Sequence, residues 1–170
     1  MIEFAPGSFV DDLDLFALIR MAVEAGFQVG VVLDPRPEHR GLKREAERLK
    51  RKLEAGARFA VTQPVYTNEE AMELAEAAAD GGAPLLLGIL PLRTARHAEF
   101  LHRRVAGISV PEEVRALMAG ARDPAAAGLE LAREMLDTAR RRFSGACLMP
   151  PFGRYELLSA LLGARPLSGT

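Results

Sequence analysis

Short apolar runs that alternate with segments of helical periodicity are the feature that most constrains the fold of this chain. Strands that alternate with helices and read as continuous apolar runs are typical of a parallel sheet covered by helices. The sequence therefore predicts an α/β fold with about four parallel strands, arranged as a partial TIM (βα)8-type barrel. We expect a single domain over residues 1–170. The predicted strands span residues 27–35, 59–66, 83–92 and 145–152.

Apolar residues at helical spacing, with start and stop signals, predict the helices between these strands. For the first helix, Asp11 or Asp12 is the expected N-cap and Gly26 the expected stop. Thr67 or Asn68 is expected to cap the helix after the second strand. The predicted helices span residues 11–26, 41–57, 67–82, 94–107, 111–122, 124–142 and 154–163.

Composition narrows the class of protein. The net charge is -1, 49% of the residues are hydrophobic and 26% are charged, which is ordinary for a soluble globular domain. A net charge so close to zero does not indicate a protein that binds nucleic acid. No apolar run approaches the length of a membrane span. The single cysteine, Cys147, excludes an internal disulfide framework. We expect a cytoplasmic protein that binds neither nucleic acid nor membranes.

The three histidines do not have the spacing of a metal site. His97 and His102 lie in one predicted helix, but their separation does not place them on one face as a ligand pair, and His39 lies far from both in the sequence. Cys147 lies in an apolar run and is most simply a core thiol. The sequence therefore predicts no metal site.

Polar side chains mark the carboxyl ends of the predicted strands, where parallel α/β sheets bind their ligands. Gln63 stands near the end of the second strand, and Arg154 follows the fourth. A carboxamide and a guanidinium at one rim could bind a planar, polar, anionic ligand. An equally open alternative is that Gln63 only satisfies loop backbone and Arg154 only caps the sheet.

The predicted second helix carries a cluster of basic residues in the stretch KREAERLKRK, residues 43–52. One interpretation is a solvated helix face with pairs four residues apart, such as Glu47 with Arg51. The other is a binding surface for a phosphate-bearing cofactor. A nucleic-acid surface is less favoured, because no aromatic residues stand between the charges.

Three stretches, LKRKLEAGARFAVTQPVY, LLLGILPLRTARHAEFLHRRVAGISVP and LMPPFGRYE, resemble the later part of methylenetetrahydrofolate reductases. The likeness includes the reductase module that some bacteria fuse to a homocysteine methyltransferase. The resemblance implies an eight-stranded βα barrel that holds FAD. In that family NAD(P)H reduces the flavin, and the flavin reduces 5,10-methylenetetrahydrofolate to 5-methyltetrahydrofolate for methionine biosynthesis. The resemblance also favours a phosphate-binding surface on the basic helix over a solvated helix face.

The resemblance also assigns roles to substrate-binding residues. Gln63 matches a glutamine that hydrogen-bonds the folate pterin, in a pocket that takes nicotinamide at another time. Arg154 matches an arginine that helps hold the folate, and Phe100 a phenylalanine that packs on it. His97 takes a pocket position that is usually Gln or Asn.

Four residues of the basic helix match positions that contact FAD in the family. Arg51 and Lys52 match best, and would neutralise the pyrophosphate. The predicted cofactor-binding residues are Glu45, Arg48, Arg51 and Lys52.

Aligned to the family, the chain carries only the later half of the barrel, so the catalytic residues stay unassigned. Half a barrel has two unpaired strand edges and an open apolar interior. We therefore expect self-association, or a partner chain that supplies the other half. Three functions remain open: part of an FAD-dependent reductase, a flavin- or folate-binding half-barrel without catalysis, and a structural remnant that binds nothing.

Overall fold

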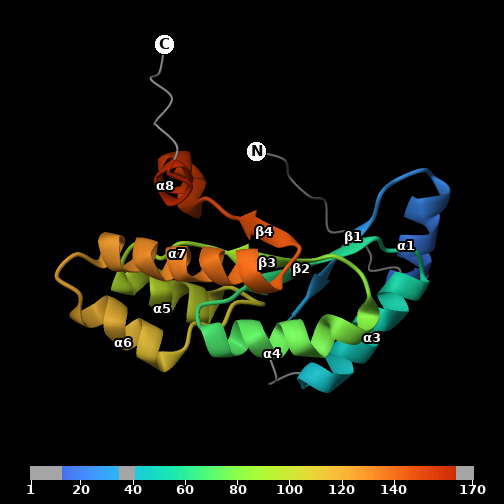
Figure 1. Ribbon diagram of the computed structural model, residues 1–170, viewed down its shortest axis with the longest axis horizontal. Coiled ribbons are helices and arrows are strands. Elements are labelled where there is room, and N and C mark those ends of the chain that lie inside the picture. The colour runs from blue at the N-terminus through green and yellow to red at the C-terminus, as the bar shows by residue number, and fades with distance from the viewer. Residues whose placement is uncertain (1–12, 35–40, 164–170) are drawn as a thin grey trace, which may run out of the picture.

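The computed structural model describes residues 13–34 and 41–163. Within these residues four strands form one sheet in the order β1-β2-β3-β4, and every neighbouring pair is parallel (Figure 1). The predicted partial TIM-type barrel is therefore confirmed. Since β1 and β4 are the outer strands of this sheet, the barrel is open. The strands are β1 (Gly30–Leu33), β2 (Phe59–Pro64), β3 (Leu85–Ile89) and β4 (Gly145–Leu148).

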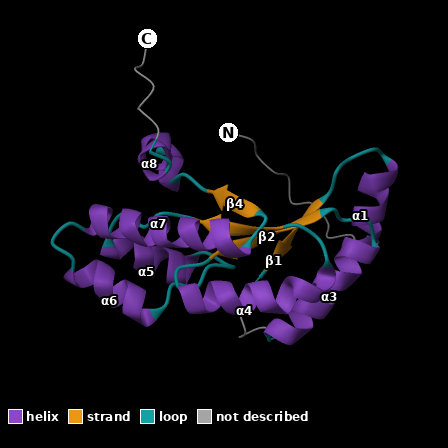
Figure 2. Cartoon of the chain, in the orientation of Figure 1, coloured by secondary structure: helices purple, strands orange, loops and turns teal. Residues whose placement is uncertain are grey.

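Helices connect the strands as the periodicity predicts (Figure 2). The basic residues in the last turn of α7 complement the helix dipole. The helices are α1 (Leu15–Glu24), α3 (Leu42–Glu54), α4 (Asn68–Ala78), α5 (Ala95–Arg104), α6 (Glu112–Gly120), α7 (Pro124–Arg142) and α8 (Tyr155–Leu161), with 3-10 turns η1 (Ala79–Gly81) and η2 (Pro151–Gly153).

The ends of several elements differ from the prediction. Asp14 caps α1, because its Oδ1 accepts a hydrogen bond from Ala17 N at 2.7 Å; the caps predicted at residues 11 and 12 lie outside the described residues, as does His39. Thr67 caps α4 as predicted, with its Oγ1 accepting from Glu70 N at 3.2 Å. β4 ends at Leu148, and the prolines that follow begin the turn η2 because they have no N–H to donate to a strand.

The helices cover one face of the sheet and leave the other face open. Along β2, Ala60 and Thr62 are each 1% exposed and face the helices. Phe59, Val61 and Gln63 are only partly buried and face the other way. Because helices surround a βα barrel on the outside, the open face is the inside of the barrel.

The open face continues onto β1. Val31 and Leu33 are buried under the helices, whereas Gly30 and Val32 are exposed, Val32 to 50%. Gly30 leaves room for the ring of Phe59, since a Cβ at Gly30 would lie 2.3 Å from that ring. These side chains form an apolar lining that a closed barrel would cover.

A second, smaller core lies beyond the carboxyl ends of the strands. It joins Tyr66, which follows β2, and Leu92, which follows β3, to the apolar faces of α5 and α6. α5 and α6 are inserted between β3 and α7, and Figure 1 shows them together at one end of the molecule. This insertion brings α5 to the rim of the barrel at which ligands bind.

Glu70, in the first turn of α4, makes the stability of the fold depend on pH. Its Oε2 accepts a hydrogen bond from Tyr66 N at 3.4 Å, yet burial, with a smaller effect of Glu113, raises the pKa of its carboxyl group. The native state therefore holds this proton more tightly than the unfolded chain. The stability that this group contributes is present at low pH and is lost as the pH rises through the raised pKa.

We expect Glu70→Gln to remove this pH-dependent component and to raise the unfolding midpoint in urea at neutral pH. The measurement is a set of urea unfolding curves between mildly acidic and neutral pH. Glu69→Gln is the matched control, because Glu69 is an exposed glutamate in the same helical turn. An equal loss of pH dependence in both variants would contradict the role of burial.

Candidate functional site at the carboxyl ends of the strands

A β-bulge at the end of β2 sets the position of Gln63. The register between β2 and β3 shifts between Val61 and Pro64. Gly88 N donates to the Oγ1 of the buried Thr62 at 2.8 Å, in place of a regular bond between the strands. Bulges of this kind redirect side chains beside active sites. The bulge therefore places the carboxamide of Gln63 on the open face, at the rim of the barrel.

Gln63 lies against the connection between α5 and α6. Gly107 in that connection has φ 93°, and a Cβ there would lie 2.6 Å from Gln63 Nε2. Only a glycine combines this backbone angle with room for the carboxamide. The inserted helices thus form one wall beside Gln63.

His97 is the buried polar residue of the same rim. It lies in the first turn of α5, where its N–H donates to the Oγ1 of Thr94 at 3.0 Å, and it is 7% exposed. Burial, with a smaller effect of the positive charge of Arg93, lowers the pKa of its imidazole. His97 is therefore neutral near pH 7. Its Nδ1 has no hydrogen-bond partner within the described residues.

The aromatic ring of Phe152 contacts this histidine. The ring of Phe152, in η2, lies 5.1 Å from the His97 ring between centroids, at an interplanar angle of 48°. Phe100, one helical turn after His97, is 50% exposed. Arg154 is also exposed, at the N-cap of α8. The structure thus gathers His97 with the segment after β4 and leaves ring faces open to solvent.

Sequence reasoning missed Phe152 and Gly107. Phe152 stands between two prolines and a glycine just after β4, and an aromatic residue in such a turn was the available signal. Gly107 gave no comparable signal, because its contact with Gln63 joins positions far apart in the chain.

Two of the four residues predicted to contact FAD form a buried pair, whose carboxylate also lies 3.9 Å from Arg48 Nη1. Lys52 and Glu45 bind each other: the Lys52 Nζ lies 3.1 Å from Glu45 Oε1, and their side chains are 6% and 8% exposed. Lys52 Nζ also donates to Val32 O at 2.6 Å. Arg51 instead lies over the ring of Phe16, with its Cζ 4.2 Å from the ring centroid. The ammonium of Lys52 is thus engaged within the protein.

Lys52 binds the outer edge of the sheet. Val29 O accepts from Arg58 N beside β2, so alternation along the strand turns the backbone of Val32 away from β2. Lys52 Nζ therefore stands where the N–H of a further strand would bind.

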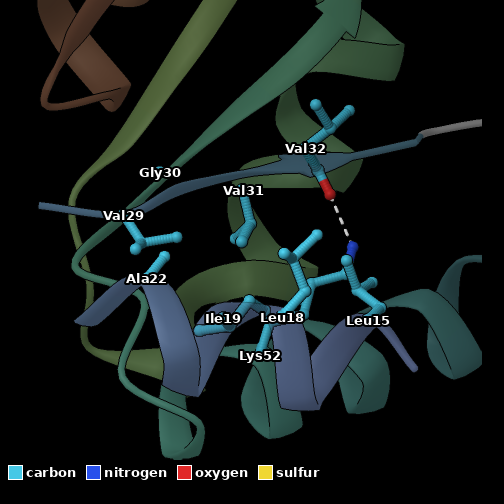
Figure 3. Close-up of a pocket in the computed structure, with 9 residues that line it drawn as sticks. All are labelled: Leu15, Leu18, Ile19, Ala22, Val29, Gly30, Val31, Val32 and Lys52. Carbon is cyan, nitrogen blue, oxygen red and sulfur yellow. Dashed lines mark hydrogen bonds between the residues drawn. The ribbon is translucent and has the colours of Figure 1, made fainter. Parts of the chain in front are cut away.

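An apolar pocket of about 530 Å³ adjoins this edge, between α1 and β1. Figure 3 shows side chains of α1 facing β1 across it, with Lys52 reaching Val32 O. Leu18, on this face of α1, is 51% exposed. The lining consists of Leu15, Leu18, Ile19, Ala22, Val29, Gly30, Val31, Val32 and Lys52.

Arg48 and Arg51 line a different, polar cavity of about 680 Å³ between α1 and α3. Arg44 adds a third guanidinium group, and Asp14 and Glu47 add carboxylates. Guanidinium groups bind phosphate oxygens well. The donor set of this cavity therefore fits a diphosphate, although Lys52 does not line it.

Metal clusters and membrane-spanning helices can be assessed for the described part of the chain only. In residues 13–34 and 41–163 there is no group of three His, Cys, Asp or Glu side chains arranged to hold a metal ion. In the same residues no helix is both long and apolar enough to cross a bilayer.

The sequence matches the family described as Methylenetetrahydrofolate reductase over residues 3–142, which is most of the chain. The chain belongs to this family. Among curated protein sequences, none matches it. The resemblance is thus confirmed at the level of the family, and the match includes the first two of the three stretches; LMPPFGRYE, residues 148–156, lies outside the matched residues.

A similar solved structure agrees on the fold. It is an uncharacterized protein from Clostridium thermocellum that binds two copies of 5-methyl-5,6,7,8-tetrahydrofolic acid. The TM-score is 0.64 at 17% sequence identity, and the match covers 88% of this chain and 57% of that chain. At this identity the likeness shows the fold alone. The chain spans little more than half the length of that protein.

Proposed function

We propose that this member of the methylenetetrahydrofolate reductase family forms the folate-binding part of a reductase. The reaction is the reduction of 5,10-methylenetetrahydrofolate to 5-methyltetrahydrofolate, with FAD as cofactor and NAD(P)H as reductant, in cytoplasmic one-carbon metabolism. The observation that carries the proposal is the position of Gln63, which a bulge holds on the open face at the carboxyl ends of the strands. Its carboxamide offers the donor and the acceptor that a pterin edge needs.

Folate binding rests on four side chains of the rim. Gln63 and His97 would hydrogen-bond the ligand, and Phe100 would contact its flat part. Arg154, exposed at the start of α8, would pair with a carboxylate of the folate tail.

FAD binding rests on the polar cavity between α1 and α3. Arg48 and Arg51 would hold the pyrophosphate there, with Arg44 beside them. Glu45 and Lys52 would act indirectly, because their buried pair fixes α3 against the edge of β1. When bound, the flavin would supply the hydride transfer.

Activity requires that the open barrel be closed, either by a second copy of the chain or by a partner that supplies further strands. The exposed apolar lining around Val32 and Leu18 favours such a contact, because a patch of this kind is seldom left bare. The alternative function is a half-barrel that binds folate or flavin without catalysis. The catalytic residues stay unassigned in this chain, and this favours the alternative for the chain on its own.

Gln63→Glu tests the proposal. The change keeps the size of the side chain, but it removes the two N–H donors and adds a charge. We expect the affinity for 5-methyltetrahydrofolate, measured by titration calorimetry, to fall by about tenfold to a hundredfold. Gln28→Glu is the matched control, since Gln28 is the other glutamine of the chain and is exposed.

Binding that is saturable but equal in both variants would exclude Gln63 from the pterin site. Absence of binding in the wild-type chain would contradict folate recognition by this half of the barrel. Binding without turnover when FAD and NADPH are added would favour the non-catalytic alternative.

A further inference from the structure

Two unfavourable features meet at the rim of the barrel, and the fold itself explains neither of them. The first is the Nδ1 of His97, which is buried without a hydrogen-bond partner in the described residues. A buried polar atom without a partner destabilises a fold, and each case in a native protein calls for a reason. His97 lies in the first turn of α5.

The second feature is the backbone of Phe152. Its φ of 54° and ψ of 34° place it in the left-handed region, and it is the sole non-glycine residue with positive φ in the described part of the chain. A bulky residue is strained in this region. Phe152 is also 73% exposed, so its ring contributes little to the core. Such strain at a strand end is typical of functional sites.

The two features are in contact, because the Phe152 ring lies against the His97 ring with 5.1 Å between centroids. His97 comes from α5 and Phe152 from the turn after β4, so the contact bridges two separate parts of the rim. We propose that His97 and Phe152 form one ligand-binding unit, in which Phe152 covers the Nδ1 of His97 and turns aside when a flat heteroaromatic ring binds. This inference rests on the folate-binding function proposed above.

The chemistry of the pair indicates the class of ligand. The outer face of the Phe152 ring is open to solvent and offers a stacking surface for a planar ring. The Nδ1 of a neutral imidazole either donates or accepts one hydrogen bond, depending on the tautomer. A pterin has a flat face and an edge that carries both donors and acceptors, so it suits either tautomer. Metal binding is not supported, since no group of three metal-ligating side chains occurs in the described residues.

Phe152→Asn separates a binding role from a structural one. Asparagine tolerates the left-handed region much better than phenylalanine, so the variant relieves the strain and removes the ring. We expect the unfolding midpoint in urea to rise, while the affinity for 5-methyltetrahydrofolate falls about tenfold. Phe152→Tyr keeps the ring and should bind like the wild type. A residue with a purely structural role would show lower stability and unchanged affinity.

A second variant tests the covered nitrogen. His97→Leu should lower the affinity by about tenfold, whereas His97→Gln, which keeps a donor and an acceptor, should retain most of it. In the free protein, chemical modification by diethyl pyrocarbonate, mapped by mass spectrometry, should reach His97 faster in Phe152→Asn than in the wild type. Equal modification rates would contradict the covering role of Phe152.

The possible failures are distinguishable. If Gln63→Glu weakens folate binding but the variants of His97 and Phe152 do not, the inference is overturned and the proposed function stands. If the wild-type chain does not bind 5-methyltetrahydrofolate, the proposed function fails and the inference fails with it.

Discussion

Lys52→Met is expected to lower the free energy of unfolding by about 3–5 kcal/mol. The Lys52 Nζ bonds both Glu45 Oε1 and Val32 O, and both charged side chains are more than nine-tenths buried. Methionine fills a similar volume but removes the charge and the donors. Glu45 is then left as a buried carboxylate without its lysine, and Val32 O loses its hydrogen bond. The measurement is urea unfolding at neutral pH.

Lys50→Met is the matched control for this change. Lys50 lies on the same helix and pairs with Asp80 at 3.3 Å, close to the 3.1 Å of the buried pair, but the two side chains are 45% and 81% exposed. A pair so well solvated contributes about 0–1 kcal/mol. The double variant Glu45→Gln/Lys52→Met should recover much of the loss, because no unpaired charge remains. Similar small losses for Lys50→Met and Lys52→Met would contradict the buried pair.

Gly128→Ala is expected to destabilise the protein by about 2–3 kcal/mol, although alanine is normally the better residue in a helix. Gly128 lies in α7, and a Cβ there would lie 2.0 Å from Leu92 O and 2.7 Å from Leu92 C. These are backbone atoms, which cannot turn away as a flexible side chain can. α7 would have to move away from the segment after β3. That segment leads into α5 at the rim of the barrel.

Gly120→Ala is the control for Gly128. Gly120 ends α6, and a Cβ there would meet no atom within 4 Å. The same substitution should therefore leave the stability unchanged or raise it by up to about 1 kcal/mol. Thermal unfolding of both variants gives the comparison. A stabilised Gly128→Ala variant would show that α7 does not pack on Leu92 as closely as the structure has it.

Much of the candidate site was predictable from position along the chain. The sequence predicts Gln63 and Arg154 near strand ends. In the structure Gln63 lies in the last part of β2, whereas Arg154 follows η2, at the N-cap of α8. Roles for particular residues were less predictable. The alignment assigns Lys52 to a phosphate, whereas the structure engages its ammonium with Glu45 and Val32. A sequence pattern cannot show this, because the bond to Val32 O depends on which side of β1 is left unpaired.

The order of strands and helices, the parallel sheet and the family could all be predicted from the amino-acid sequence. The reason is that hydrophobic periodicity, caps and glycine stops act within a few residues of one another, so a sequence shows them directly. The surroundings of the polar groups at the rim could not be predicted in this way. The bulge that directs Gln63, the contact of Gly107 with it, and the covered Nδ1 of His97 against Phe152 arise between segments that are distant in the sequence. Such contacts follow from how the elements pack, and packing depends on the whole chain at once.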